Sequence, residues 1–282
     1  MDSDIELLER EYNPRLTVRD FPQIYESWAE RGAAASRLRA CEADLEYGSS
    51  PAERLDFFHA HGADAPLFVF IHGGYWRSRD KSEFAWIAPP FLQNGVAVAV
   101  TNYGLAPATP IEDIVRQQIK AVGWLYLNAE SLRFNRNRIV VAGHSAGGHL
   151  TAMMMAALWP QVDSRLPADV VKAGLAISGL FDLQPLVQAP FLKDDLQLDT
   201  QRARMLSPIN MPPASKAPLI TAVGALESSE FKRQSVDFGK HWSGNHLRHL
   251  EVAGANHLTV CDELANPASP LFDAALELIQ KA

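Results

Sequence analysis

Short apolar runs alternate with amphipathic stretches along the chain from residue 55 onward. The runs at 67–71 and 96–101 are continuous and β-prone, which predicts strands buried on both faces. Further strands are predicted, in chain order, at 55–60, 138–142, 173–178, 218–223 and 247–252. Because helical patterns separate these strands, we predict an α/β fold with a mostly parallel central sheet and helices on both faces.

The helices are predicted from capping residues and from apolar spacing. Thr109, Pro110 and Glu112 match an N-cap, a first-turn proline and a capping-box glutamate, so a helix is expected to begin there. Apolar residues from Ile111 to Leu125 give this helix one buried stripe. Further helices are expected to begin near residue 145 and to cover 231–242 and 271–279.

Two regions depart from the alternation of strands and helices. Residues 1–50 are polar, with apolar residues at helical spacing, and predict an N-terminal helical arm of one helix, or of two short helices divided at Gly32. The arm either only packs on the body or forms a flap over an active site. Residues 180–217 hold five prolines and are too long for an ordinary connection, which predicts an inserted cap. Since no second core is visible, residues 1–282 are predicted to form a single domain.

Composition and charge narrow the function classes. The chain has 282 residues, 47% hydrophobic and 21% charged, as an ordinary globular protein does. Its net charge of −7 argues against a nucleic-acid partner and against a polybasic membrane contact. The acidic N-terminus does not resemble a signal peptide, and the longest apolar run, 152–159, is far shorter than the roughly 20 residues that span a bilayer. A cytoplasmic protein is therefore expected.

The two cysteines, Cys41 and Cys261, are far apart in sequence. They exclude a disulfide scaffold and a C-x-x-C metal or redox motif. Two reduced thiols are expected, with one long-range disulfide as the alternative. No residue spacing indicates a metal site, and no dinucleotide or phosphate-binding motif occurs, so neither metal nor cofactor is expected.

The sharpest local motif is Gly143-His-Ser-Ala-Gly147, which lies between a predicted strand and a predicted helix. That context is the one a G-x-S-x-G nucleophile elbow requires, because the flanking glycines relieve a turn too tight for Cβ atoms. Ser145 is therefore the predicted nucleophile. Upstream, consecutive glycines follow the strand 67–71, and the amides of Gly73, Gly74 and Ala146 are predicted to form an oxyanion hole.

A catalytic serine needs a base and an acid, and the chain order in this type of site is serine, acid, histidine. Of nine histidines, His257 fits that order best, in a short loop after the last predicted strand. Glu227 follows the preceding strand and is the predicted acid, which would hold the imidazole tautomer. Glu230 and Asp182 are the rival carboxylates.

Together, the His72-Gly-Gly-Tyr-Trp76 motif, the Ser145 pentapeptide and Asn256-His257 resemble the α/β-hydrolase family. More narrowly, the chain is similar to its kynurenine formamidase branch, close to the hormone-sensitive-lipase-like esterases. In those esterases a third glycine usually occupies the place of Tyr75. The segments Glu11-Tyr-Asn-Pro-Arg15 and 227–235 also resemble the formamidases, although an aspartate is usual there where this chain has Glu227.

This resemblance implies a serine hydrolase that cleaves an aryl formamide such as N-formylkynurenine through an acyl-enzyme. Tyr75 and Trp76 are expected to form an aromatic wall for the substrate, with Phe181 and Phe191 from the cap as partners. One alternative is a carboxylesterase for short-acyl or aryl esters, and another is a non-catalytic binding protein of the same fold. The expected partner is a small-molecule amide or ester. The sequence leaves the oligomeric state open, with a homodimer as one alternative.

Overall fold

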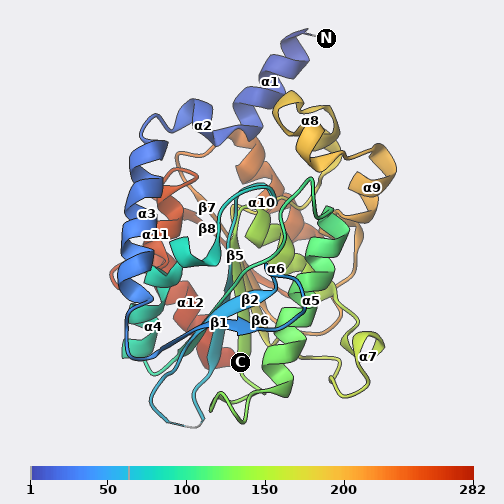
Figure 1. Ribbon diagram of the computed structural model, residues 1–282. Coiled ribbons are helices and arrows are strands. Elements are labelled where there is room, and N and C mark those ends of the chain that lie inside the picture. Colours follow the sequence, from blue (N-terminus) through green and yellow to red (C-terminus); the bar gives the residue numbers. More distant parts are fainter. Residues whose placement is uncertain (1, 63) are drawn as a thin grey trace.

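The computed structural model describes residues 2–62 and 64–282. Its centre is one eight-stranded sheet with the order β1-β2-β4-β3-β5-β6-β7-β8 (Figure 1). β2 pairs antiparallel with both β1 and β4, and all other neighbours are parallel. The strands are β1 (Cys41–Glu46), β2 (Arg54–Phe58), β3 (Leu67–Ile71), β4 (Ala97–Thr101), β5 (Ile139–His144), β6 (Ala173–Ile177), β7 (Leu219–Gly224) and β8 (His246–Val252).

Both faces of the sheet are buried under helices, as the continuous apolar strands predict. In β3, Leu67, Val69 and Ile71 belong to one core cluster, whereas Phe68 and Phe70 belong to the other. The first cluster lies under α5 (Ile111–Leu127), α6 (Ala146–Ala156) and α10 (Ser229–His241). The second lies under α3 (Phe21–Ala35), α4 (Ala88–Gln93) and α12 (Pro270–Lys281) (Figure 1). The predicted fold class is confirmed.

All seven predicted strands occur, with ends within two residues of the prediction. The strand that the sequence did not reveal is β1, which lies inside the predicted arm. It reads Cys-Glu-Ala-Asp-Leu-Glu and is mostly exposed at the edge of the sheet. Its register with β2 also shifts between Glu42 and Leu45, so no alternation of apolar and polar residues marks it.

Two details of the predicted helices are wrong. α5 begins at Ile111, and Pro110 rather than Thr109 occupies the N-cap position without a side-chain cap. Thr109 instead packs its side chain against Gly104, where a Cβ would lie 2.3 Å from the hydroxyl oxygen. Gly32 does not divide a helix either, because it lies buried within α3. A Cβ at Gly32 would lie 1.9 Å from the Ser82 carbonyl oxygen, so this glycine lets α3 approach the turn η1 (Lys81–Glu83) closely.

The N-terminal segment divides elsewhere. α1 (Asp2–Tyr12) ends before Asn13, and the side chain of Asn13 caps the short α2 (Pro14–Thr17) before α3 begins. Residues 180–217, where the cap insertion is predicted, form four short helices: η3 (Gln184–Gln188), α8 (Pro190–Leu196), α9 (Thr200–Met205) and η4 (Pro208–Asn210). In Figure 1 α1 and α8 lie at the same end of the molecule, above the sheet.

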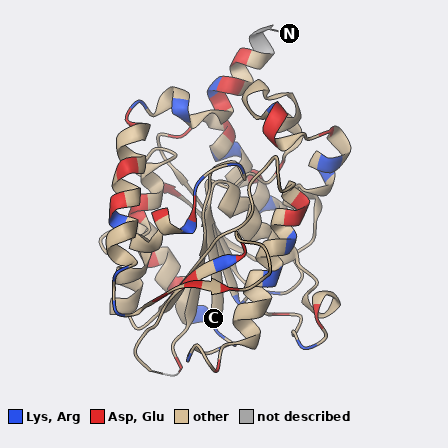
Figure 2. Cartoon of the chain, in the orientation of Figure 1, with Lys and Arg blue, Asp and Glu red and all other residues tan. Residues whose placement is uncertain are grey.

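The remaining elements are η2 (Ala85–Ile87), α7 (Trp159–Val162) and α11 (Thr259–Glu263). Both cysteines are free thiols. Figure 2 shows positive and negative residues interleaved along the outer helices, whereas the central strands β3, β5 and β6 carry none. Among the helices of the described residues, none has the length and hydropathy needed to cross a membrane.

Candidate active site

Ser145 lies in the tight turn between β5 and α6. Its backbone has φ 58° and ψ −117°, and its amide donates to the Ile177 carbonyl at 2.8 Å. Glycine is required on both sides: a Cβ at Gly143 would lie 2.2 Å from the Gly147 carbonyl oxygen, and one at Gly147 would lie 1.9 Å from that of Ile71. The turn therefore has the geometry that the motif predicts and presents the serine at the carboxyl edge of the sheet.

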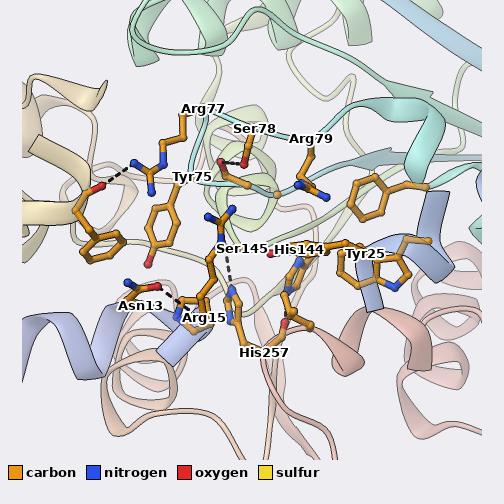
Figure 3. A pocket seen from close by; sticks show the side chains of 17 residues that line it. Asn13, Arg15, Tyr25, Tyr75, Arg77, Ser78, Arg79, His144, Ser145 and His257 are labelled. Atoms are coloured by element: carbon orange, nitrogen blue, oxygen red, sulfur yellow. Dashed lines mark hydrogen bonds between the residues drawn. The ribbon is translucent and has the colours of Figure 1, made fainter. Parts of the chain in front are cut away.

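A continuous hydrogen-bonded chain runs from this serine to a carboxylate. Ser145 Oγ lies 3.1 Å from His257 Nε2, and His257 Nδ1 lies 2.6 Å from Glu227 Oε2 (Figure 3 shows the serine and histidine). All three residues are buried. Since Nδ1 faces a carboxylate, it carries the proton, and Nε2 is left as the acceptor toward the serine hydroxyl. The structure thus brings together the three residues predicted as nucleophile, base and acid.

The other carboxylate oxygen of Glu227, Oε1, is also hydrogen-bonded. Oε1 accepts from the Ser178 hydroxyl at 2.5 Å and from the Gly224 amide at 2.7 Å. Neither rival carboxylate contacts His257. Glu230 accepts from the Tyr12 hydroxyl at 2.5 Å and pairs with Arg233, while Asp182 caps its own turn by accepting from the Gln184 amide.

His257 is also fixed from its backbone side. His144 Nε2 lies 2.6 Å from the His257 carbonyl oxygen, to which it donates. Burial and the neighbouring His257 hold the pKa of His144 well below its usual range, so this histidine is neutral at physiological pH. The Phe231 ring also packs against the His257 imidazole, with ring centroids 4.2 Å apart. The sequence did not indicate these positioning roles.

The glycine loop after β3 lies directly against the serine. A Cβ at Gly73 would lie 3.1 Å from Ser145 Cβ and 2.8 Å from the His144 carbonyl oxygen, and Gly74 has φ +105°. The amides of Gly73 and Gly74 donate to no protein acceptor within the part of the chain that the structure describes. Both glycines line the cavity that holds Ser145. Ala146 begins α6 beside them, so its amide is a first-turn donor.

Aromatic side chains line the cavity above Ser145. Tyr75 meets Phe191 edge to face at 5.7 Å, as the predicted wall requires, and Tyr25, Trp28 and Phe84 complete the lining. The other two aromatic candidates lie elsewhere in the structure. Trp76 is fully buried with its ring against His149 at 5.0 Å, and Phe181 stacks on Phe238 at 4.1 Å.

Three arginines that the sequence did not single out surround the same cavity (Figure 3). Arg77 pairs with Asp195, and Arg79 pairs with Glu83 at 2.7 Å while lying 4.0 Å above the Tyr25 ring. Arg15, from α2, has no carboxylate partner among the side chains that the structure describes. Within the described part of the chain, the mouth of the cavity therefore carries one arginine without a carboxylate partner. Within residues 2–62 and 64–282, no cluster of three or more His, Cys, Asp or Glu could hold a metal ion.

A family model described as BD-FAE matches residues 55–240. The chain belongs to the BD-FAE family. The match includes Ser145 and Glu227, but it ends before His257 and begins after the arm that carries Arg15. Within this BD-FAE chain, Arg15 and His257 thus lie outside the matched residues, whereas Arg77 and Arg79 lie inside them.

The relatives of this BD-FAE chain carry the names of enzymes that cleave amides or esters. It is 27% identical to the kynurenine formamidase of Danio rerio over 281 residues, which cover 96% of this chain and 93% of that protein. It is 28% identical to esterase LipC of Mycobacterium tuberculosis, over 80% of this chain and 62% of that protein. A crystal structure from Silicibacter sp. TM1040, described as a thioesterase, has a TM-score of 0.81 and 30% identity over 93% of this chain and 96% of that chain. The protein is a hydrolase acting on amides or esters.

Proposed function

We propose that the protein is a serine hydrolase in which Ser145 is the nucleophile, His257 the general base and Glu227 the orienting acid. The observation that carries this proposal is the hydrogen-bonded chain from Ser145 through His257 to Glu227, buried beside two glycine amides that have no acceptor among the described residues. A nucleophile, a base within hydrogen-bond reach and a third group that orients the base are the parts that covalent catalysis by serine needs.

The reaction follows from this arrangement. Ser145 Oγ attacks the substrate carbonyl carbon as His257 Nε2 takes its proton. The carbonyl oxygen becomes an oxyanion and receives hydrogen bonds from the amides of Gly73, Gly74 and Ala146. The bond to the leaving amine or alcohol then breaks, and His257 returns the proton to that group. Water, deprotonated by His257, attacks the acyl-enzyme, and the acid leaves as Ser145 regains its proton.

We further propose an aryl formamide of the N-formylkynurenine type as the preferred substrate. The nearly full-length similarity to a kynurenine formamidase supports this, as does the cavity lining of Tyr75, Phe191 and Tyr25. Flat aromatic walls suit an aromatic leaving amine. Arg15, which has no carboxylate partner in residues 2–62 and 64–282, suits a substrate that carries a carboxylate, because guanidinium groups bind carboxylates through charge-assisted hydrogen bonds. Similarity to esterase LipC favours short-acyl esters as the second candidate.

The test compares kcat/KM for N-formyl-kynurenine and for p-nitrophenyl acetate, with Ser145→Ala as the blank. A formamide value of about 10⁴ M⁻¹s⁻¹ or more, in the common enzymatic range, supports the formamidase proposal. Turnover of the activated ester alone would leave the serine hydrolase standing and overturn the substrate. If the native protein reacts with neither substrate and a fluorophosphonate probe does not label Ser145, the proposed catalytic role is wrong.

A further inference from the structure

A buried phenol outside the catalytic residues touches the backbone that carries two of the proposed oxyanion donors. Tyr103 follows β4, and its hydroxyl donates to the His72 carbonyl oxygen at 2.9 Å and to the Gly73 carbonyl oxygen at 3.3 Å. We propose that Tyr103 is a positioning residue that aims the Gly73 and Gly74 amides into the oxyanion hole. The inference rests on the proposed function. It adds the residue that orients the two amides toward the oxyanion of the transition state.

The argument depends on the planarity of the peptide bond. The His72 carbonyl shares a trans peptide unit with the Gly73 amide, and the Gly73 carbonyl shares the next unit with the Gly74 amide. In a trans unit the C=O and N–H bonds point in opposite directions. One hydroxyl that draws both carbonyls toward itself therefore turns both amides away from itself. Two successive amides on one side of the chain form a concave anion-binding nest.

The opposite side of this loop is the cavity beside the serine. Gly73 lies against Ser145 and both glycines line the cavity, whereas Tyr103 does not line it and is only 1% exposed. The phenol is thus behind the loop and the reacting carbonyl in front of it. Neither glycine amide has another acceptor in the described protein, so no hydrogen bond made by the amides themselves fixes their direction.

The hydroxyl itself is held in one place. The Tyr103 ring stacks on the His72 imidazole at 4.2 Å with planes 13° apart, and His72 stacks in turn on Phe84 at 5.8 Å. His72 Nδ1 lies 2.8 Å from the Gly73 carbonyl oxygen and supports the same carbonyl. Burial raises the pKa of the Tyr103 phenol above its usual range, so its hydroxyl stays a donor at every working pH.

The decisive variant is Tyr103→Phe, which keeps the ring and its stacking but removes the donor. Its matched control is Tyr47→Phe: the Tyr47 hydroxyl is also buried and donates to a backbone carbonyl, that of Asn102, at 2.6 Å, but it does not touch the glycine loop. Each variant loses one buried phenol donor, which at Tyr103 is shared between two carbonyls and at Tyr47 is given to one. The two should therefore lose similar thermal stability and differ in catalysis.

The assay uses p-nitrophenyl acetate, so that it does not depend on the formamide preference. Losing one oxyanion donor outright costs about 10²–10³-fold in kcat. Misaiming two donors that stay present should cost Tyr103→Phe about 10- to 100-fold in kcat, with KM within about 2-fold, whereas Tyr47→Phe keeps its kcat. Tyr103→Phe should also bind a trifluoromethyl ketone more weakly, by the same factor as its loss of kcat, because the serine adduct of this ketone carries the oxyanion. Active-site titration with a fluorophosphonate normalises all rates to folded enzyme.

The opposing outcomes are distinct. If Tyr103→Phe matches Tyr47→Phe in kcat and in ketone affinity, the positioning role is wrong while the proposed function stands. If the wild type turns over no substrate, the proposed function fails and this inference with it. If Tyr103→Phe does not fold, His72→Phe is the second variant, because His72 Nδ1 is the other donor to the Gly73 carbonyl oxygen. It should lower kcat and ketone affinity together, by less than about 10-fold, and an unchanged ketone affinity would overturn the inference.

Discussion

Replacing Glu227 by glutamine tests the proposed acid with a change of one atom. Oε1 accepts from the Ser178 hydroxyl and the Gly224 amide, and an amide nitrogen placed there would face the Gly224 N–H. The glutamine oxygen must therefore keep that position, and its NH₂ group then replaces Oε2 opposite His257 Nδ1. Two N–H groups cannot face each other across a 2.6 Å contact, so the imidazole proton moves to Nε2.

This shift disables the base. With its proton on Nε2, His257 can no longer accept the proton of Ser145 Oγ, 3.1 Å away. The same wrong-tautomer substitution in a serine protease triad lowers kcat by about 10⁴-fold. We expect a loss of that order here, equivalent to about 5.4 kcal/mol of transition-state stabilisation at 1.36 kcal/mol for each factor of ten. KM should change little, because Glu227 does not line the cavity above the serine.

The test measures kcat and KM for N-formyl-kynurenine and for p-nitrophenyl acetate, and Tm in parallel. Glu230→Gln is the matched control, because it makes the same chemical change three residues away at a carboxylate that holds Tyr12 instead of His257. It should keep kcat within about 3-fold, since a glutamine oxygen can still accept from the Tyr12 hydroxyl. A Glu227→Gln enzyme with more than a tenth of wild-type kcat, or a Glu230→Gln enzyme that is equally impaired, would refute the reasoning.

Three further predictions concern other parts of the molecule. Arg15→Gln should raise KM for N-formyl-kynurenine about 10-fold or more and leave KM for neutral p-nitrophenyl acetate unchanged; an equal change for Arg19→Gln, an exposed arginine on the same arm, would contradict a carboxylate contact. Burial lowers the pKa of His149 to about 4, so the folded chain binds fewer protons than the unfolded one between pH 6.5 and 4, and the free energy of unfolding falls as pH falls through that window. Denaturant unfolding at pH 7, 5.5 and 4.5 gives the free energy of unfolding at each pH. This free energy should fall less steeply with falling pH in His149→Gln than in the wild type, and an equal fall would rule this group out. Burial raises the pKa of the Cys41 thiol to about 11, so iodoacetamide at pH 8 should alkylate it at least 10-fold more slowly than a free cysteine, as followed by mass spectrometry; a rate equal to that of free cysteine would contradict this prediction.

The parts of the site that the sequence predicts best are those with local steric causes. The turn at Ser145 needs glycine at 143 and 147 because backbone oxygens occupy the space where each Cβ would lie. The alternation of strands and helices then fixes which edge of the sheet the serine, Glu227 and His257 share. Such features restrict the residue types at a few positions that are neighbours in the chain, so the sequence reveals them.

What the sequence missed depends on contacts between distant segments. The sequence favours Glu227 over Glu230 as the acid, but only the packing shows that Glu230 takes the Tyr12 hydroxyl from the N-terminal arm. Arg15 is one exposed arginine among several until α2 is placed beside the cavity. Thr109 is a local exception, because its side chain packs against Gly104, five residues earlier in the same loop, instead of capping α5.

The N-terminal arm has a consequence for how enzymes of this kind can diversify. The Tyr12 carbonyl accepts from the Tyr75 hydroxyl and the Glu11 carbonyl from Ser228, so the arm is tied to the loops on both sides of the serine. Yet none of its described residues belongs to the proposed proton relay of Ser145, His257 and Glu227. Part of the cavity lining, Arg15 and Tyr25 among it, is thereby encoded separately from Ser145, Glu227 and His257. Exchanging residues 1–40 between homologues should therefore shift substrate preference while leaving the proposed proton relay unchanged, a route that laboratory recombination can follow with a single crossover.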